Sequence, residues 1–211
     1  MHEEVKTDNL IMRVFLETIE NIIGPNGLKS VLNYAHLEKY IDHLPPDNDE
    51  KEIPSRDLHS LYLALYQMFG GKGAHSLQLR VGRENVYRGL KKRPGIAKTM
   101  KMASRLVPEI TKMRLALERL EGYMKGASSN GADQSFVEIT EQEDCFLFIQ
   151  RDSIESDGIT SETPICGVSQ GIMEALIEWI TGHTHKVEEI ECRATGCSAD
   201  VFKIWKAHQK D

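Results

Sequence analysis

Four cysteines carry the clearest chemical information in this sequence of 211 residues, and all of them lie in its last third: Cys145, Cys166, Cys192 and Cys197. Disulfide frameworks are typical of short secreted chains, and four cysteines in a chain of this size do not fit that class. Cys166 and Cys192 also have a carboxylate nearby in Glu189, and two thiolates with a carboxylate can hold a metal ion in a tetrahedral site. The alternative is that these are buried thiols beside a solvated acidic strand.

Glu189 and Cys192 can share one ion only under a geometric condition. Side chains three residues apart in a flat strand point to opposite faces. Both can therefore reach one ion only if the strand bulges or ends between them. His183 and His185 lie close by in the sequence and are further possible ligands, although histidines at the start of a strand are often simply exposed.

The residues around this set resemble the C-terminal signature of the 4-vinyl reductase domain family. That signature is a Cys before a helix, followed by Glu-x-x-Cys-x-Ala-x-Gly. Cys166 follows Pro164-Ile165, and residues 189–196 (EIECRATG) match the signature position by position. Looser similarity upstream includes LNYAHLEKYIDHLPP, FGGKG and LRVGRENVYRGL, so the resemblance covers residues 28–206.

This resemblance implies a domain that encloses a small hydrophobic, aromatic or tetrapyrrole-like molecule between helices and a sheet. The fold is shared with nitric-oxide-sensing haem domains and vesicle-tethering subunits. The resemblance also implies a structural zinc bound by Cys166, Glu189 and Cys192, with Asp200 at the position that holds a third Cys in the family. Cys197 is the alternative fourth ligand. The haem branch carries a Tyr-x-Ser-x-Arg motif that this sequence lacks, and we therefore predict no haem.

Aromatic and arginine residues are candidates for contacts with that molecule. Phe146, Phe148 and Trp179 are predicted to line a cavity, although aromatic residues on strands and helices are more often plain core. Arg80 and Arg83 share a helical face, and their guanidinium groups can bind a carboxylate or phosphate through paired hydrogen bonds. A solvated helix face is the alternative for both arginines.

The spacing of apolar residues predicts helices in the first half of the chain and a small sheet in the second. Helical periodicity recurs over residues 9–23, 28–44, 55–68, 74–92, 96–107 and 108–123. Glycine-rich segments at residues 24–27 and 70–73 are expected to end two of these helices. Strands are predicted at 136–140, 145–150, 185–194 and 201–205, around a helix at 168–180. This order predicts an α+β fold with an antiparallel sheet of about four strands, strand–strand–helix–strand–strand, after the helices.

The predicted domain organisation is simple. Residues 1–27 form an N-terminal helical extension, residues 28–206 the ligand-binding domain, and residues 207–211 a tail. The apolar stripe of the first helix either contacts a partner protein or a second copy of the chain, or covers the domain's own core. Gly82 and Gly89 are seven residues apart and share a helical face, where a neighbouring helix could pack closely.

Composition and charge exclude some classes of protein. Apolar residues make up 40% and charged residues 27%, which is typical of globular domains. No apolar run approaches the roughly 18 residues that span a membrane, and the polar start lacks the pattern of a signal peptide, so we predict a cytoplasmic protein. Residues 55–126 hold 15 Lys/Arg and 5 Asp/Glu, whereas residues 127–211 hold 6 and 16. These blocks either attract one another or steer an anionic ligand. The net charge of the chain is -6, and this acidic balance argues against nucleic-acid binding.

Three functions are consistent with these residues and motifs. The first is a homodimeric, metal-containing binding domain that acts as a sensor or carrier for a hydrophobic small molecule, through a partner protein. The second is an enzyme or accessory factor in (bacterio)chlorophyll biosynthesis. A vinyl reduction needs a hydride source, and the sequence contains no recognisable flavin or nicotinamide motif, which argues against autonomous catalysis. The third is a dimeric scaffold without a ligand.

Overall fold

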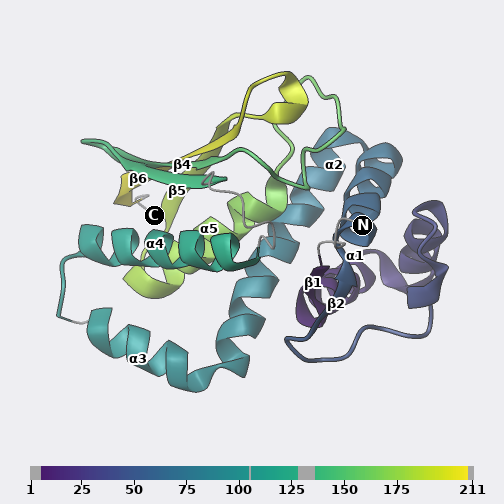
Figure 1. Ribbon diagram of the computed structural model, residues 1–211, viewed down its shortest axis with the longest axis horizontal. Helices are drawn as coiled ribbons and strands as arrows, with labels where there is room; N and C mark the ends of the chain where they lie inside the picture. Colours follow the sequence, from purple (N-terminus) through teal and green to yellow (C-terminus); the bar gives the residue numbers. More distant parts are fainter. Residues whose placement is uncertain (1–5, 105, 128–135, 209–211) are drawn as a thin grey trace.

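Helices build the first half of the chain, and most strands lie in the second half (Figure 1). The computed structural model describes residues 6–104, 106–127 and 136–208. The helices are α1 (Asn9–Tyr34), α2 (Ser55–Lys92), α3 (Pro94–Ser104), α4 (Glu109–Ala127) and α5 (Gly167–Thr181). The strands are β1 (Lys6–Asp8), β2 (Lys51–Pro54), β3 (Val137–Glu141), β4 (Cys145–Gln150), β5 (His185–Glu191) and β6 (Asp200–His208). The predicted α+β class is confirmed.

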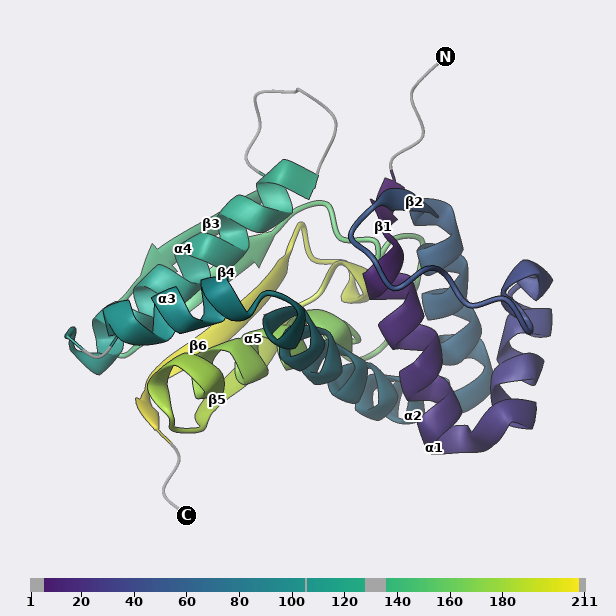
Figure 2. The same cartoon turned by 90° about the horizontal axis from the view of Figure 1, so that it is seen from below.

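The four C-terminal strands form one antiparallel sheet in the order β3-β4-β6-β5. Figure 2 shows α4 and α5 lying across the same side of this sheet. The hairpin of β3 and β4 lies where alternation predicts it. The predicted strand over residues 185–194 ends earlier, at Glu191, and the last strand extends to His208. A second, two-stranded sheet of β1 and β2 was not predicted.

Two predicted helix ends are kinks inside longer helices. Gly24 in α1 has a φ of +75°, and Gly70 in α2 has a φ of +68°. Glycine adopts this left-handed backbone without the steric cost that a side chain brings, so the chain turns sharply and a helix resumes. The predicted helix over residues 28–44 ends at Tyr34, and a single 3-10 turn follows at Glu38–Tyr40.

The apolar stripe of α1 covers the protein's own core. Met12, Phe15 and Leu16 are fully buried, and they belong to the same apolar cluster as Leu61 and Leu65 of α2. Of the two alternatives for this stripe, the structure therefore shows the internal one. A second apolar cluster lies between the sheet, α4 and α5.

Helices α2 and α5 cross at very close range, and glycine makes this possible. A Cβ atom built on Gly82 would lie 2.2 Å from the carbonyl oxygen of Val168. One built on Gly171 would lie 2.2 Å from the carbonyl oxygen of Leu79. The close approach predicted at Gly82 is confirmed. The one predicted at Gly89 is wrong, because its nearest neighbour would be the side chain of Arg93.

Ion pairs join the basic middle of the chain to the acidic segments on either side. Arg83 pairs with Glu174, and Arg114 binds Glu141 at 2.7 Å. Toward the N-terminal segment, Arg93 pairs with Asp49 at 2.7 Å. The structure thus shows the charge blocks attracting one another within the fold. Among the described helices, none combines the length and apolarity that crossing a membrane would require.

Candidate metal-binding site

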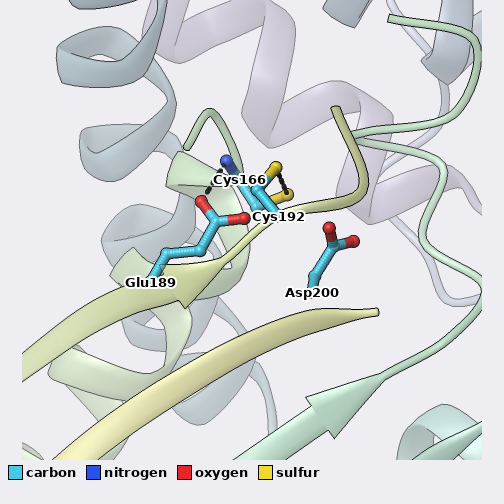
Figure 3. Close-up of side chains that lie close together, drawn as sticks. All are labelled: Cys166, Glu189, Cys192 and Asp200. Atoms are coloured by element: carbon cyan, nitrogen blue, oxygen red, sulfur yellow. Dashed lines mark hydrogen bonds between the residues drawn. The ribbon is translucent and has the colours of Figure 1, made fainter. Parts of the chain in front are cut away.

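The structure brings four predicted ligands together at one end of the sheet (Figure 3). Their ligand atoms all lie within 4.8 Å of one another, and all four side chains are buried. We call this set the Cys–Glu–Asp cluster: Cys166, Glu189, Cys192 and Asp200. Cys166 immediately precedes α5, Glu189 lies on β5, Cys192 follows the end of β5, and Asp200 begins β6.

The end of β5 has the irregularity that a shared site requires. The register between β5 and β6 shifts between Glu189 and Glu191, and the strand ends at Glu191. A short 3-10 turn at Arg193–Thr195 then turns the chain toward β6. The regular alternation of the strand is broken here, so that Glu189 and Cys192 approach the same point.

Hydrogen bonds hold the two carboxylates in place. The backbone N–H of Cys166 donates to Glu189 Oε2 at 2.8 Å. Asp200 Oδ1 accepts from the backbone N–H of Arg193 at 2.7 Å, and its Oδ2 accepts from the Ser156 hydroxyl at 2.7 Å. Glu189 Oε1 is buried and has no hydrogen-bond partner among the described residues. A buried carboxylate oxygen without a partner is costly unless a proton or a cation reaches it.

The two sulfur atoms have a separation that suits a shared ion. Cys166 Sγ and Cys192 Sγ lie 3.9 Å apart, and both cysteines are free thiols rather than a disulfide. Two thiolates on one tetrahedral ion, with metal–sulfur bonds of about 2.3 Å, lie about 3.8 Å apart. The observed distance is therefore close to that of a coordinated pair.

Burial and mutual proximity change the acidity of the cluster. Burial raises the pKa of Glu189 to about 9, and the neighbouring Cys192 acts in the same direction. The hydrogen bond with Cys166 lowers the pKa of Cys192 to about 7, and the same contact and burial raise the pKa of Cys166. Negative charges at such close range repel one another, so the cluster either keeps protons or binds a cation.

A fifth buried acid, Glu155, supports the start of α5 beside this cluster. Its carboxylate accepts from the backbone N–H groups of Val168 at 2.9 Å and Ser169 at 2.8 Å, and from the Ser169 hydroxyl at 2.6 Å. Burial raises the pKa of Glu155 to about 7. Sequence reasoning missed this residue, because it lies in an irregular segment and its partners are 13 and 14 residues away.

Other predicted site residues lie elsewhere. Cys197 is partly exposed and contacts Thr195, so Asp200 rather than Cys197 joins the cluster. His183 and His185 do not join it either, since both contact Glu109 at 3.0 Å.

The predicted ligand contacts separate into two groups. Phe146 and Phe148 are fully buried in the apolar cluster beneath the sheet, and Trp179 packs against the same cluster. Arg80 and Arg83 are exposed on α2, and the guanidinium of Arg83 binds Glu174. The aromatic residues therefore share one region of the fold, and the arginines do not take part in it.

Comparisons with known proteins identify the fold. No family model matches the chain, and no curated protein matches it. The structure is similar to an Fe(II) unliganded H-NOX protein from K. algicida, with a TM-score of 0.65 and 14% identity over 97% of this chain and 98% of that chain. The fold is the H-NOX fold.

Two further structures agree with that assignment. A structure from work on heme distortion in the H-NOX family gives a TM-score of 0.60 with 13% identity, over 97% of both chains. An H-NOX protein from S. oneidensis in the Fe(II)NO state gives 0.54 with 12% identity, over 94% of this chain and 99% of that one. The predicted relation in fold to haem domains is confirmed, whereas membership of the 4-vinyl reductase family is not confirmed and stays a prediction.

The likeness corrects the cofactor prediction. From the missing Tyr-x-Ser-x-Arg motif we predicted no haem, and from the signature around Cys166, Glu189 and Cys192 a structural zinc. The H-NOX neighbours are haem domains, as their heme distortion and Fe(II)NO state indicate. The prediction of zinc without haem is therefore wrong as a statement about this fold, because the absence of one short motif does not exclude haem from a chain that shares it.

Proposed function

We propose that this chain is a domain of the H-NOX fold that binds a hydrophobic or tetrapyrrole-like small molecule between the sheet, α4 and α5, and acts as a sensor through a partner protein. One observation carries the proposal. Four methionines belong to or border the apolar layer between these elements: Met113 and Met173 are buried in it, and Met100 and Met124 are partly buried and pack against the same cluster. Methionine side chains are flexible and polarisable, so this layer can rearrange around an incoming molecule.

The ligand-type atoms within this apolar layer are sulfur atoms. Haem iron needs an axial ligand from the protein, such as a histidine, a thiolate or a thioether. The layer holds the thioethers of Met113 and Met173, and the thiols of Cys166 and Cys192 belong to the same cluster. We assign none of these sulfur atoms to haem, and the ligand class is left to direct measurement.

A specific observation favours a second candidate function, a scaffold without a ligand. Two hollows on the described surface have volumes of about 110 and 570 Å³, and neither lies in the methionine-lined layer. Charged residues line both of them, including Arg83 and Glu174 in the smaller and Arg88 and Lys92 in the larger. A ligand in either of these two hollows would meet charged side chains rather than the apolar layer.

The Cys–Glu–Asp cluster is the proposed site of one metal ion within this domain. Thiolate ligands favour soft or borderline ions, and four protein ligands fill a tetrahedron without leaving an open position. Such an ion would tie the start of α5 to the ends of β5 and β6, and it would satisfy the unpartnered oxygen of Glu189. Its role would be structural, because no coordination position remains for a substrate.

Native mass spectrometry of the full chain, purified without chelator and then denatured, tests these proposals together. It reports bound metal, bound organic mass and oligomeric state in one experiment, and elemental analysis identifies the ion. Cys192→Ser should lose one metal equivalent. The matched control is Cys197→Ser, which removes a thiol outside the cluster and should keep the metal.

The ligand is tested separately, by titration with haem and with aromatic hydrocarbons. Binding in the layer should quench the fluorescence of Trp179, because this side chain packs against the layer. Met113→Trp should then block binding, because a larger side chain fills the same space. An organic mass or saturable quenching supports the sensor. A protein that carries metal but binds none of these probes would exclude the sensor and leave the scaffold.

A further inference from the structure

A second group of ligand-type side chains lies away from the Cys–Glu–Asp cluster, where the start of α4 meets one end of the sheet. We call it the Glu–His cluster: Glu109, His183, His185 and His208. Glu109 is the first residue of α4, His183 lies in the turn after α5, and His185 and His208 are paired residues of β5 and β6. Residues far apart in the sequence thus converge on one carboxylate.

Two of the three contacts with Glu109 have the separation of ligands on one metal ion, and the third is slightly longer. His183 Nδ1 lies 3.0 Å from Glu109 Oε2, and His185 Nε2 lies 3.0 Å from Glu109 Oε1. His208 Nδ1 is 3.8 Å from the same Oε1 atom. Nitrogen and oxygen ligands about 2.0–2.2 Å from an ion lie roughly 2.9–3.5 Å from one another. Glu109, His183 and His208 also place one ligand atom each within 4.8 Å of the others.

The buried histidine shows why this carboxylate needs a cation. The side chain of His185 is 0% exposed, and its Nδ1 lies 2.9 Å from the carbonyl oxygen of Trp205. A carbonyl oxygen only accepts, so Nδ1 carries the hydrogen and donates it. In the neutral ring, Nε2 then carries a lone pair and no hydrogen. It faces an oxygen of the Glu109 carboxylate, which can likewise only accept a hydrogen bond. His185 Nε2 accordingly has no hydrogen-bond partner among the described residues.

Either a proton or a metal ion can supply the cation that this arrangement needs. Histidines that bind metals commonly donate their other ring N–H to a backbone carbonyl, as His185 does to Trp205. One proton on His185 would let Nε2 donate to Glu109. A divalent ion would instead be held by Glu109, His183 and His208, whose ligand atoms all lie within 4.8 Å of one another.

We propose that Glu109, His183 and His208 of the Glu–His cluster bind one divalent transition-metal ion, separately from the Cys–Glu–Asp cluster. Imidazole and carboxylate ligands suit borderline ions such as Fe²⁺, Co²⁺, Ni²⁺ and Cu²⁺. His183 and His208 are each 52% exposed and Glu109 is 30% exposed, so an ion can enter from solvent and keep bound water. The proposal does not depend on the small-molecule function or on a metal at the other cluster.

Calorimetric titration of the full chain with Ni²⁺ tests the proposal. We expect the double variant His183→Ala/His208→Ala to lose one Ni²⁺ equivalent, or to bind it more than about 100-fold more weakly. His43→Ala, which removes an exposed histidine outside the cluster, should bind as the parent does. Wild-type protein that takes up no Ni²⁺, or a double variant that binds unchanged, would overturn the proposal.

A measurement without variants localises the ion. Ni²⁺ is paramagnetic and broadens nuclear magnetic resonance signals close to it. Substoichiometric Ni²⁺ should broaden the amide signals of residues 109–111 and 182–186 before those of residues 189–193. Broadening that begins at residues 189–193, or spreads evenly over exposed histidines such as His43, would show that the Glu–His cluster is not a metal site.

Discussion

The close crossing of α2 and α5 makes Gly171→Ala a sharp test of the packing that positions the Cys–Glu–Asp cluster. The added methyl group would lie 2.2 Å from the carbonyl oxygen of Leu79, more than 1 Å short of ordinary contact. Because the carbonyl oxygen of Leu79 is a backbone atom and cannot rotate away as a side chain could, α2 and α5 must move apart to make room for the methyl group. Overpacking of this kind costs about 3 kcal/mol at its upper range, and the better helix propensity of Ala returns about 1 kcal/mol. The free energy of unfolding should therefore fall by about 2 kcal/mol.

For a chain of this length, that loss lowers the Tm by about 4–8 °C. Urea unfolding followed by circular dichroism measures the same quantity at 25 °C. Gly122→Ala is the matched control, because Gly122 is a helical glycine of α4 whose Cβ would meet nothing within 4 Å. The free energy of unfolding of Gly122→Ala should rise by up to about 1 kcal/mol, because Ala favours a helix over Gly. Opposite signs for the two variants are expected, and a Gly171→Ala protein as stable as Gly122→Ala would refute the reasoning.

Three further predictions concern a thiol of the cluster, a buried acid and a helix cap. With a metal ion bound, Cys192→Ser should cost about 3–5 kcal/mol because it removes one partner of the buried cation, while Cys197→Ser stays within about 0.5 kcal/mol in the same urea assay. The raised pKa of Glu155, about 7, means that its contribution to stability is complete below its unfolded value near 4.5 and is lost as the pH rises through 7. The loss is up to about 3 kcal/mol, and Glu155→Gln should flatten the slope between pH 5 and 8; an equal slope in the variant would contradict this. Asp8 caps α1 and accepts from the Tyr123 hydroxyl at 2.9 Å, so Asp8→Ala should lower the free energy of unfolding by about 1 kcal/mol, and an unchanged midpoint would count against the cap.

Periodicity predicted much of the fold, because helices and strands bury one face and the sequence records that face directly. It placed α5 and β4 to within a residue. It failed where a glycine bends a helix without ending it: at Gly24 and Gly70 the residue type indicates a break, but only packing against the rest of the fold decides that a helix resumes. The pairing of β1 with β2 could not be predicted either, because both strands are too short to show an alternation of apolar and polar residues.

The candidate site was predictable in part for a related reason. Cys166, Glu189 and Cys192 could be named from residue types and a signature, and the strand irregularity they require could be stated as a condition. The sequence could not predict that Asp200 rather than Cys197 joins the cluster. That choice depends on hydrogen bonds from the Arg193 backbone N–H and the Ser156 hydroxyl, which hold Asp200 in place. The same limit applies to the Glu–His cluster, whose contacts span 74 residues between Glu109 and His183 and have no local pattern in the sequence.

The two clusters lie at opposite ends of the same pair of elements. Cys166 precedes α5 and His183 follows it, while His185 begins β5 and Glu189 lies near its other end. Helix α5 and strand β5 also form two sides of the methionine-lined layer. Clusters of ligand-type side chains lie at both ends of this pair of elements. If an ion bound at either cluster changed the position of α5 relative to β5, it would by linkage change the affinity of the layer for a small molecule, and a molecule bound in the layer would change the affinity for that ion by the same factor.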